Sequence, residues 1–280
     1  MFRKLLRYDM REGCRQNWHK LVIAALLSAV FCIDFRMRLG QIYHVESQIP
    51  DTSWLDMVMY LFGGMKSYIP SPAESFHFPV RWMLFYSFLF YATLYYPQRD
   101  FQGTGIYILP RSGRRLEWWL SKCVWNISFV LAVFLTVYLT AAVFGMIWGV
   151  TFDLHVSGQY IADIYQIPEE IPEVPQEAAW AVLLIPALTA AGISLLEMTL
   201  ILFIRPIFAF GAVEVILLCS AYSVNPLLAG NYMMPVRSGY IVENGFCLWQ
   251  GAAAAGILIG GSMVFGILKF KRKDLLGTGG

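Results

Sequence analysis

A long stretch without a charged side chain, CVWNISFVLAVFLTVYLTAAVFGMIWGV, runs from residue 123 to residue 150. A helix that crosses the hydrocarbon core of a bilayer needs about 20 predominantly apolar residues, so this stretch exceeds the requirement. Together with the aromatic residues just before it, the stretch predicts a membrane-spanning helix over residues 119–150. The excess length allows this helix to tilt in the bilayer or to project beyond it.

Five further apolar segments have the length of a membrane span. Hydrophobic residues make up 58% of the chain and charged residues only 14%, whereas charged residues account for about 25% of a soluble domain. This composition predicts an all-α polytopic membrane protein with about six transmembrane helices in a single transmembrane domain, residues 1–280. The other predicted spans are residues 18–35, 79–96, 178–204, 206–224 and 249–270.

Two prolines mark the predicted fourth and fifth spans. Pro186 lies inside the fourth span, where its missing N–H group predicts a kink. Only Arg205 and Pro206 separate the two spans, so we expect a tight helical hairpin. Proline suits the first turn of the fifth helix, because the first N–H groups of a helix have no partner within the helix.

The distribution of Lys and Arg predicts the orientation of the chain, because cytoplasmic segments carry an excess of these residues. With both termini in the cytoplasm, the inner segments are residues 1–17, residues 98–118, the turn at Arg205 and the C-terminal tail. These segments and the adjoining span ends hold all but five of the 21 Lys and Arg residues. We therefore expect a multi-pass protein of a bacterial plasma membrane. The five exceptions are Arg36, Arg38, Lys66, Arg81 and Arg237.

The predicted outer regions are residues 39–78, 151–177 and 225–248. The stretch 153–177 carries six acidic residues and no Lys or Arg, which favours either attraction of a cationic ligand or an ordinary solvated loop. Residues 54–64 form an apolar segment that is too short to span. Such a segment lies in the membrane interface or enters the bilayer partway, and the sequence leaves both open.

The sequence lacks the short motifs of several enzyme classes. It contains no G-x-x-x-x-G-K-[ST] phosphate loop, no H-E-x-x-H zinc motif and no G-x-S-x-G nucleophile motif. The five cysteines and four histidines show no metal-binding or redox spacing. We therefore expect a non-catalytic chain with no catalytic residues, no metal site and no cofactor of its own.

The fourth and fifth predicted spans each contain one acidic residue, Glu197 and Glu214. A carboxyl group in hydrocarbon is costly unless it is paired, protonated or hydrated. Because the two spans form a hairpin, these residues are expected to approach each other. Two interpretations stay open: they line a pathway or a hinge, or each forms a hydrogen bond to Ser, Thr or Tyr of a neighbouring helix.

The inner loop 98–118 carries the strongest functional signal. It is basic, is interrupted by glycines and contains the short apolar run 106–109. One interpretation is a docking element for a cytoplasmic partner. The alternative is a juxtamembrane loop that fixes topology and contacts anionic lipid. The candidate docking residues are Arg99, Asp100, Arg111, Ser112, Gly113, Arg114, Arg115 and Glu117.

At this loop the chain resembles the permease subunits of type-2 ABC exporters. Three segments carry the resemblance: MFRKLLRYDMR at 1–11, LPRSGRRLEWWLSK at 109–122 and FKRKDLL at 270–276. The six-span layout with both ends inside fits as well. The resemblance implies an exporter-like bundle in which a cytoplasmic N-terminal helix (1–17) and the coupling loop 98–118 dock on a separate ATP-binding cassette subunit.

The resemblance also implies partners and a division of labour. Two permease subunits, identical or paralogous, would enclose the pathway in the lipid bilayer, and ATP and Mg would bind to the partner ATPase subunits. No nucleic acid is expected. The acidic outer stretch favours a peptide or amphipathic substrate, such as a cationic antimicrobial peptide. Aromatic residues of the second span either line that pathway or pack at the lipid interface.

Two hypotheses from other classes stand beside the exporter permease. The first is a membrane enzyme that acts on lipid or peptide, for which Glu197 and Glu214 are the candidate polar residues of the fourth and fifth predicted spans. The second is a non-transporting sensor or scaffold whose acidic outer stretch binds a cationic peptide. Co-purification with an ATPase subunit would favour the permease over both.

Overall fold

The computed structural model describes residues 2–43, 52–68, 75–100, 115–167, 171 and 174–272. Within these residues the chain is all-α, and strand pairing is limited to two isolated bridges, Ser53 with Thr151 and Ser238 with Phe246. The helices are α1 (Phe2–Ile42), α2 (Trp54–Phe62), α3 (Val80–Leu94), α4 (Tyr96–Asp100), α6 (Arg115–Trp148), α7 (Gly158–Tyr165), α8 (Ala178–Leu183), α9 (Ile185–Leu200), α10 (Pro206–Tyr222) and α11 (Leu248–Arg272), with short 3-10 helices η2 (Ala229–Met233) and η3 (Pro235–Arg237).

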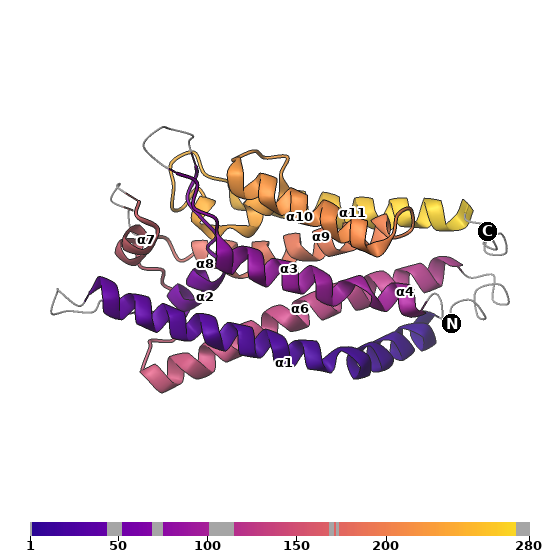
Figure 1. Cartoon of the computed structure of the whole chain (residues 1–280), viewed down its shortest axis with the longest axis horizontal. Coiled ribbons are helices and arrows are strands. Elements are labelled where there is room, and N and C mark those ends of the chain that lie inside the picture. Colours follow the sequence, from indigo (N-terminus) through magenta and orange to yellow (C-terminus); the bar gives the residue numbers. More distant parts are fainter. Residues whose placement is uncertain are drawn as a thin grey trace.

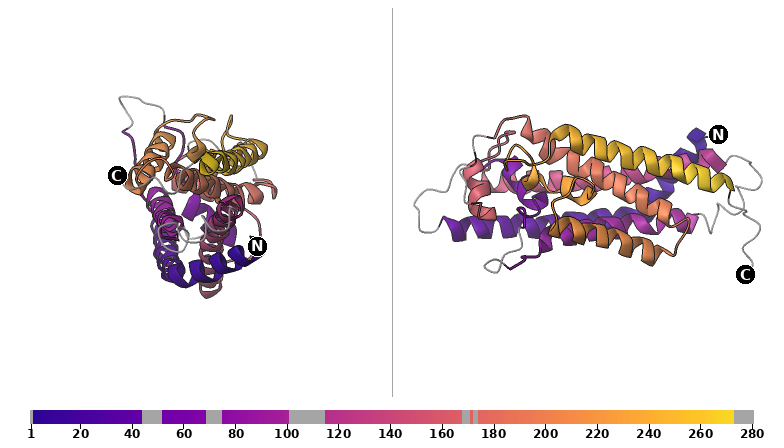
Figure 2. Two further views of the ribbon diagram at one scale, coloured as in Figure 1. Left: turned by 90° about the vertical axis from the view of Figure 1, so that its right-hand side faces the viewer. Right: turned by 90° about the horizontal axis from the view of Figure 1, so that it is seen from above.

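The long helices form an elongated bundle (Figure 1). α6 packs against α1 and against α9, and α9 packs in turn against α11. The N-terminal end of α1, the C-terminal end of α11 and α4 lie at one end of the bundle, called the inner end here (Figures 1 and 2). α2 and α7 lie toward the opposite, outer end.

Three described helices are long and apolar enough to cross a membrane by length and composition: Leu116–Trp148, Ala178–Leu200 and Leu248–Lys269. They indicate a multi-pass membrane protein. The second and fifth predicted spans coincide with the shorter apolar helices Val80–Leu94 and Pro206–Tyr222. The first predicted span lies within α1, where 13 residues separate Lys20 from Asp34. Six spans therefore stay a prediction.

The prolines of the fourth and fifth spans act locally as the sequence predicts. The helix is interrupted at Leu184, and Pro186 lies in the first turn of α9. α10 begins at Pro206, with Arg205 in extended conformation before it. Because the missing proline N–H would have no partner in a first helical turn, both positions tolerate the residue at little cost.

The apolar segment after residue 53 is a buried helix of the outer end. Every residue of α2 from Leu55 to Phe62 is buried, and α2 packs against α6, α8 and α1. Ser53 and Asp56 form a reciprocal capping box at its start. Asp56 also accepts the backbone N–H of Ser157 at 2.9 Å. Burial still raises the pKa of Asp56 above 3.8, because desolvation outweighs these hydrogen bonds.

Most aromatic side chains of α3 lie in the core of the chain. Trp82, Phe85, Tyr86 and Phe90 are at most 3% exposed. Phe62 of α2 packs edge-on against Phe85 with ring centroids 5.0 Å apart, an arrangement that adds to the stabilisation from apolar burial. These four rings are therefore unavailable to line a pathway within the monomer.

Arg237 joins several segments at the outer end although its side chain is buried. Its guanidinium donates to the carbonyl oxygens of Ser220 (2.5 Å), Ala221 (2.8 Å) and Met65 (3.1 Å), and also to Asn231 Oδ1. Burial lowers the pKa of Arg237 to about 10. The cation satisfies carbonyl groups at the C-terminal end of α10, where a positive charge is favoured.

Candidate functional site

The structure describes some of the predicted docking residues, and those that it describes lie at the inner end. Residues 101–114, with Arg111, Ser112, Gly113 and Arg114, lie outside the described residues. Arg115 is the first residue of α6, and its side chain also lies outside the description. The guanidinium of Arg99 is exposed and lies 5.8 Å from the ring centroid of Tyr95. These predictions are therefore untested at the centre of the loop.

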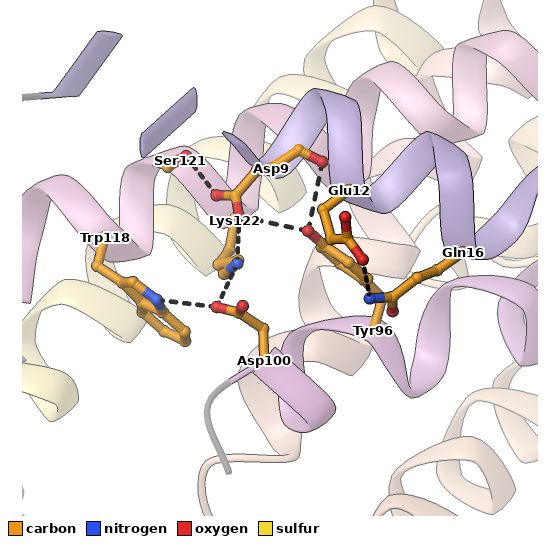
Figure 3. A network of polar contacts seen from close by, with 8 residues as sticks. All are labelled: Asp9, Glu12, Gln16, Tyr96, Asp100, Trp118, Ser121 and Lys122. Carbon is orange, nitrogen blue, oxygen red and sulfur yellow. Dashed lines mark hydrogen bonds and ion pairs between the residues drawn. The ribbon is translucent and has the colours of Figure 1, made fainter. Parts of the chain in front are cut away.

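The two ends of the loop meet at a buried lysine (Figure 3). Lys122 of α6 is fully buried, and its Nζ lies 2.5 Å from Asp9 Oδ1 and 2.6 Å from Asp100 Oδ2. Asp9 belongs to α1, and Asp100 is the last residue of α4. One cation thus links α1, α4 and α6, and we call Lys122, Asp9 and Asp100 the inner clamp.

Neighbouring polar groups orient both carboxylates of the inner clamp. Ser121 Oγ donates to Asp9 Oδ2 at 2.5 Å, and Trp118 Nε1 donates to Asp100 Oδ2 at 3.2 Å. The Tyr96 hydroxyl donates to Asp9 Oδ1 at 3.3 Å. Charge-assisted hydrogen bonds of this kind are about twice as strong as neutral ones. They hold the two carboxylates in fixed positions around the lysine.

Aromatic rings surround the ammonium group as well. Lys122 Nζ lies 5.0 Å from the ring centroid of Tyr96 and 5.2 Å from that of Trp118, within the range of a cation–π interaction. Side-chain exposure is 3% for Asp9 and 9% for Asp100. Removing three charges from water is costly, and the cost is offset only when all the groups are paired and well oriented. The arrangement therefore specifies one relative position of the three helices.

The sequence contained a signal for the inner clamp that the loop motif did not include. Lys122 is a lone basic residue at the start of the most apolar span, and Asp9 is the only acidic residue in the basic segment 1–11. A charge in a span requires a partner. The pairing itself spans 113 positions along the chain, so only the packing of α1 on α6 brings the two residues together.

The two acidic residues of the α9–α10 hairpin occupy different surroundings. Ser87 Oγ of α3 donates to Glu214 Oε2 at 2.8 Å. Glu197 of α9 is buried, and α9 packs against α10, which carries Glu214. Among the described residues, Oε1 of each has no hydrogen-bond partner. Both glutamates therefore lie on helices that pack against each other and against α3.

A family model matches residues 21–276 of the chain, and its description is "Protein of unknown function (DUF2705)". The chain belongs to the DUF2705 family. The matched range includes Asp100 and Lys122, whereas Asp9 precedes it. The comparison with curated proteins and the comparison with solved structures each return no match.

Proposed function

We propose that this DUF2705 member is the transmembrane permease subunit of an ATP-driven type-2 ABC exporter. In this proposal it spans a bacterial plasma membrane six times, with residues 18–35 of α1 as the first span. The inner end of the bundle faces the cytoplasm, and the acidic stretch 153–177 faces outward. The chain supplies a pathway for a peptide or amphipathic substrate and leaves ATP hydrolysis to a separate subunit.

The inner clamp is the single observation that carries the proposal. Asp100 immediately precedes residues 101–114, and Trp118, Ser121 and Lys122 follow within the first two turns of α6. The clamp fastens both ends of this loop to each other and to Asp9 of α1. A partner that moved the loop would therefore move α1 and α6 together.

The tight contact of α1 with α6 supports this transmission. Gly13 of α1 is buried, and a Cβ atom there would lie 2.0 Å from Trp125 Nε1 of α6. Asn17 Nδ2 donates to the Gly13 carbonyl oxygen at 2.8 Å. The N-terminal half of α1 thus lies directly on the start of α6, and a displacement of one helix displaces the other.

The proposed partners follow from the composition of the chain and from its exposed apolar faces. The sequence has no phosphate loop, which agrees with ATP and Mg bound by partner cassette subunits. Exposed apolar side chains on α6 and α11 would contact lipid or a second permease subunit. They include Leu131, Leu135, Leu139, Ile147, Ile257, Val264 and Phe265.

The test is co-purification of the tagged chain from its native membrane, with identification of bound proteins by mass spectrometry. We expect an ATP-binding cassette subunit. Reversing the charges of Arg111, Arg114 and Arg115 to Glu should reduce its recovery at least about 10-fold, because each lost ion pair weakens docking. The matched control is Arg36→Glu at the outer end, which should leave recovery unchanged.

A second variant separates docking from transmission. Asp9→Asn alters the inner clamp without touching the loop, so the ATPase should still bind while substrate-stimulated ATP hydrolysis falls. Absence of any ATPase subunit, or equal recovery with the wild-type chain and the triple Glu variant, would contradict the proposal.

A further inference from the structure

A cavity of about 450 Å³ opens at the outer end of the bundle, at the opposite end from the inner clamp. It lies between the C-terminal part of α1, α2, the start of α3 and the end of α7. The side chains that decide its character are Asp34 and Arg38 of α1, Tyr60 of α2, Arg81 of α3 and Lys66 in the segment between α2 and α3.

Basic residues that lie outside the predicted inner segments are concentrated in the lining of this cavity. Five Lys and Arg residues depart from the predicted inner location, and Arg38, Lys66 and Arg81 are three of them. All three line this cavity, and Asp34 is the only carboxylate among its described lining residues. Positive charge is depleted at the outer side of membrane proteins. Its concentration around one cavity therefore points to a local function.

The single carboxylate is shared among several donors. Asp34 Oδ2 accepts the Tyr60 hydroxyl at 2.5 Å, and it lies 3.5 Å from Arg81 Nη1 and 3.6 Å from Arg38 Nε. One negative charge thus faces two guanidinium groups. Among the described lining residues, the positive charge of the two guanidinium groups therefore exceeds the negative charge of this carboxylate.

Arg81 is held in a position that suits an oxyanion. Its guanidinium lies 3.5 Å from the ring centroid of Tyr60, which fixes the plane of the group. Nη1 is buried, and it forms no hydrogen bond to the described residues beyond its ion pair with Asp34. The Arg81 side chain as a whole is 23% exposed, and a planar guanidinium that reaches the cavity matches the oxygens of a phosphate in a two-pronged contact.

The start of α3 adds a second favourable element. Pro79, Val80 and Arg81 line the cavity. Pro79 is the N-cap of the 15-residue helix α3 and makes no side-chain hydrogen bond, and Val80 and Arg81 are the first two residues of the helix. The N-terminus of a helix attracts anions through its N–H groups and its partial positive charge. Arg81 and the helix terminus therefore favour a ligand of the same sign.

We propose that this cavity binds a phosphate group, presented either by the head group of an anionic lipid or by a soluble phosphate compound. Arg81 provides the two-pronged contact, and Arg38 and Lys66 contribute charge from the sides. The cavity borders the outer ends of the predicted spans 18–35 and 79–96, the depth at which lipid head groups lie. A cationic ligand is one of the two interpretations of the acidic stretch 153–177, whereas the ligand proposed for this cavity is an anion.

The experiment uses the purified full-length chain and two probes. Isothermal titration with inorganic phosphate in a zwitterionic detergent tests the soluble source. Native mass spectrometry after incubation with phosphatidylglycerol or with phosphatidylcholine tests the lipid source. Binding of inorganic phosphate, or selective retention of phosphatidylglycerol, supports the site and identifies the source.

Substitutions in the lining test whether the phosphate group binds in this cavity. Arg81→Gln and Arg38→Gln should each weaken binding at least about 10-fold, because a hydrogen bond to a charged group is lost. Arg36→Gln, on the exposed surface of the same helix, should bind as the wild type does. Arg38 is half exposed, so its variant is expected to fold even where Arg81→Gln does not.

Failure to bind either probe, or equal binding by the wild type and Arg38→Gln, would overturn the proposal. None of these measurements involves an ATPase, so the outcome is separate from that of the exporter proposal.

Discussion

Lys122 faces two carboxylates at the inner end. The net charge of this cluster predicts how a substitution of each residue changes the stability of the protein. With all three groups ionised, the cluster carries one net negative charge. Removing the lysine takes away the cation that pairs with the buried Asp9 carboxylate, whereas removing the Asp9 charge leaves the ion pair of Lys122 with Asp100 in place. A buried charge that loses its partner is far more costly than an intact pair.

We therefore predict that Lys122→Met destabilises the chain by about 3–5 kcal/mol and that Asp9→Asn costs clearly less. Thermal unfolding of the purified protein in detergent measures both. The control is Lys4→Met, which removes an exposed lysine of α1 and should change stability by less than about 0.5 kcal/mol. A Lys122→Met variant as stable as the wild type would show that the clamp does not hold the inner end together.

At the level of the helices, α1 offers two glycines in opposite surroundings. A Cβ at Gly13 would overlap the Trp125 ring, whereas a Cβ at Gly40 would meet nothing within 4 Å. Gly13→Ala should cost about 1–3 kcal/mol through overpacking. Gly40→Ala should stabilise by about 0.5–1 kcal/mol, because alanine is the better helix former.

The difference between the two alanine variants isolates the contact of α1 with α6 from the general effect of helix propensity. Urea or thermal unfolding in detergent measures it. If both variants shifted the free energy of unfolding in the same direction, the result would contradict close packing of Gly13 against Trp125.

The elements that the sequence predicts correctly are those set by local pattern. The apolar stretch 123–150 predicts the body of α6, and Arg205–Pro206 predicts the start of α10. For residues 54–64 the sequence predicts an interfacial or partly inserted segment and does not distinguish the two. The burial of α2 depends on its packing against α6 and α8. The pairing of Asp9 with Lys122 and the gathering of Arg38 and Arg81 likewise arise from tertiary packing, which residue spacing does not encode.

For the molecule as a whole, two native cysteines test the orientation. Cys14 is exposed near the inner end and Cys247 is exposed just before α11, toward the outer end. In intact cells a membrane-impermeant maleimide should label Cys247 and leave Cys14 unlabelled. Labelling of both should follow permeabilisation.

Single Cys14→Ser and Cys247→Ser variants assign each signal to its residue. Modification of Cys14 in sealed cells would reverse the proposed orientation and would place the inner clamp outside the cytoplasm.

The residues of the inner clamp are synthesised at widely separated times. Asp9 leaves the ribosome 113 residues ahead of Lys122, an interval of roughly 6–20 s at the usual rates of translation. Throughout that interval Lys122 has not yet been synthesised, so the Asp9 carboxylate cannot pair with it. The inner clamp therefore forms only after α6 has been synthesised and has packed against α1, which brings Lys122 to the Asp9 carboxylate.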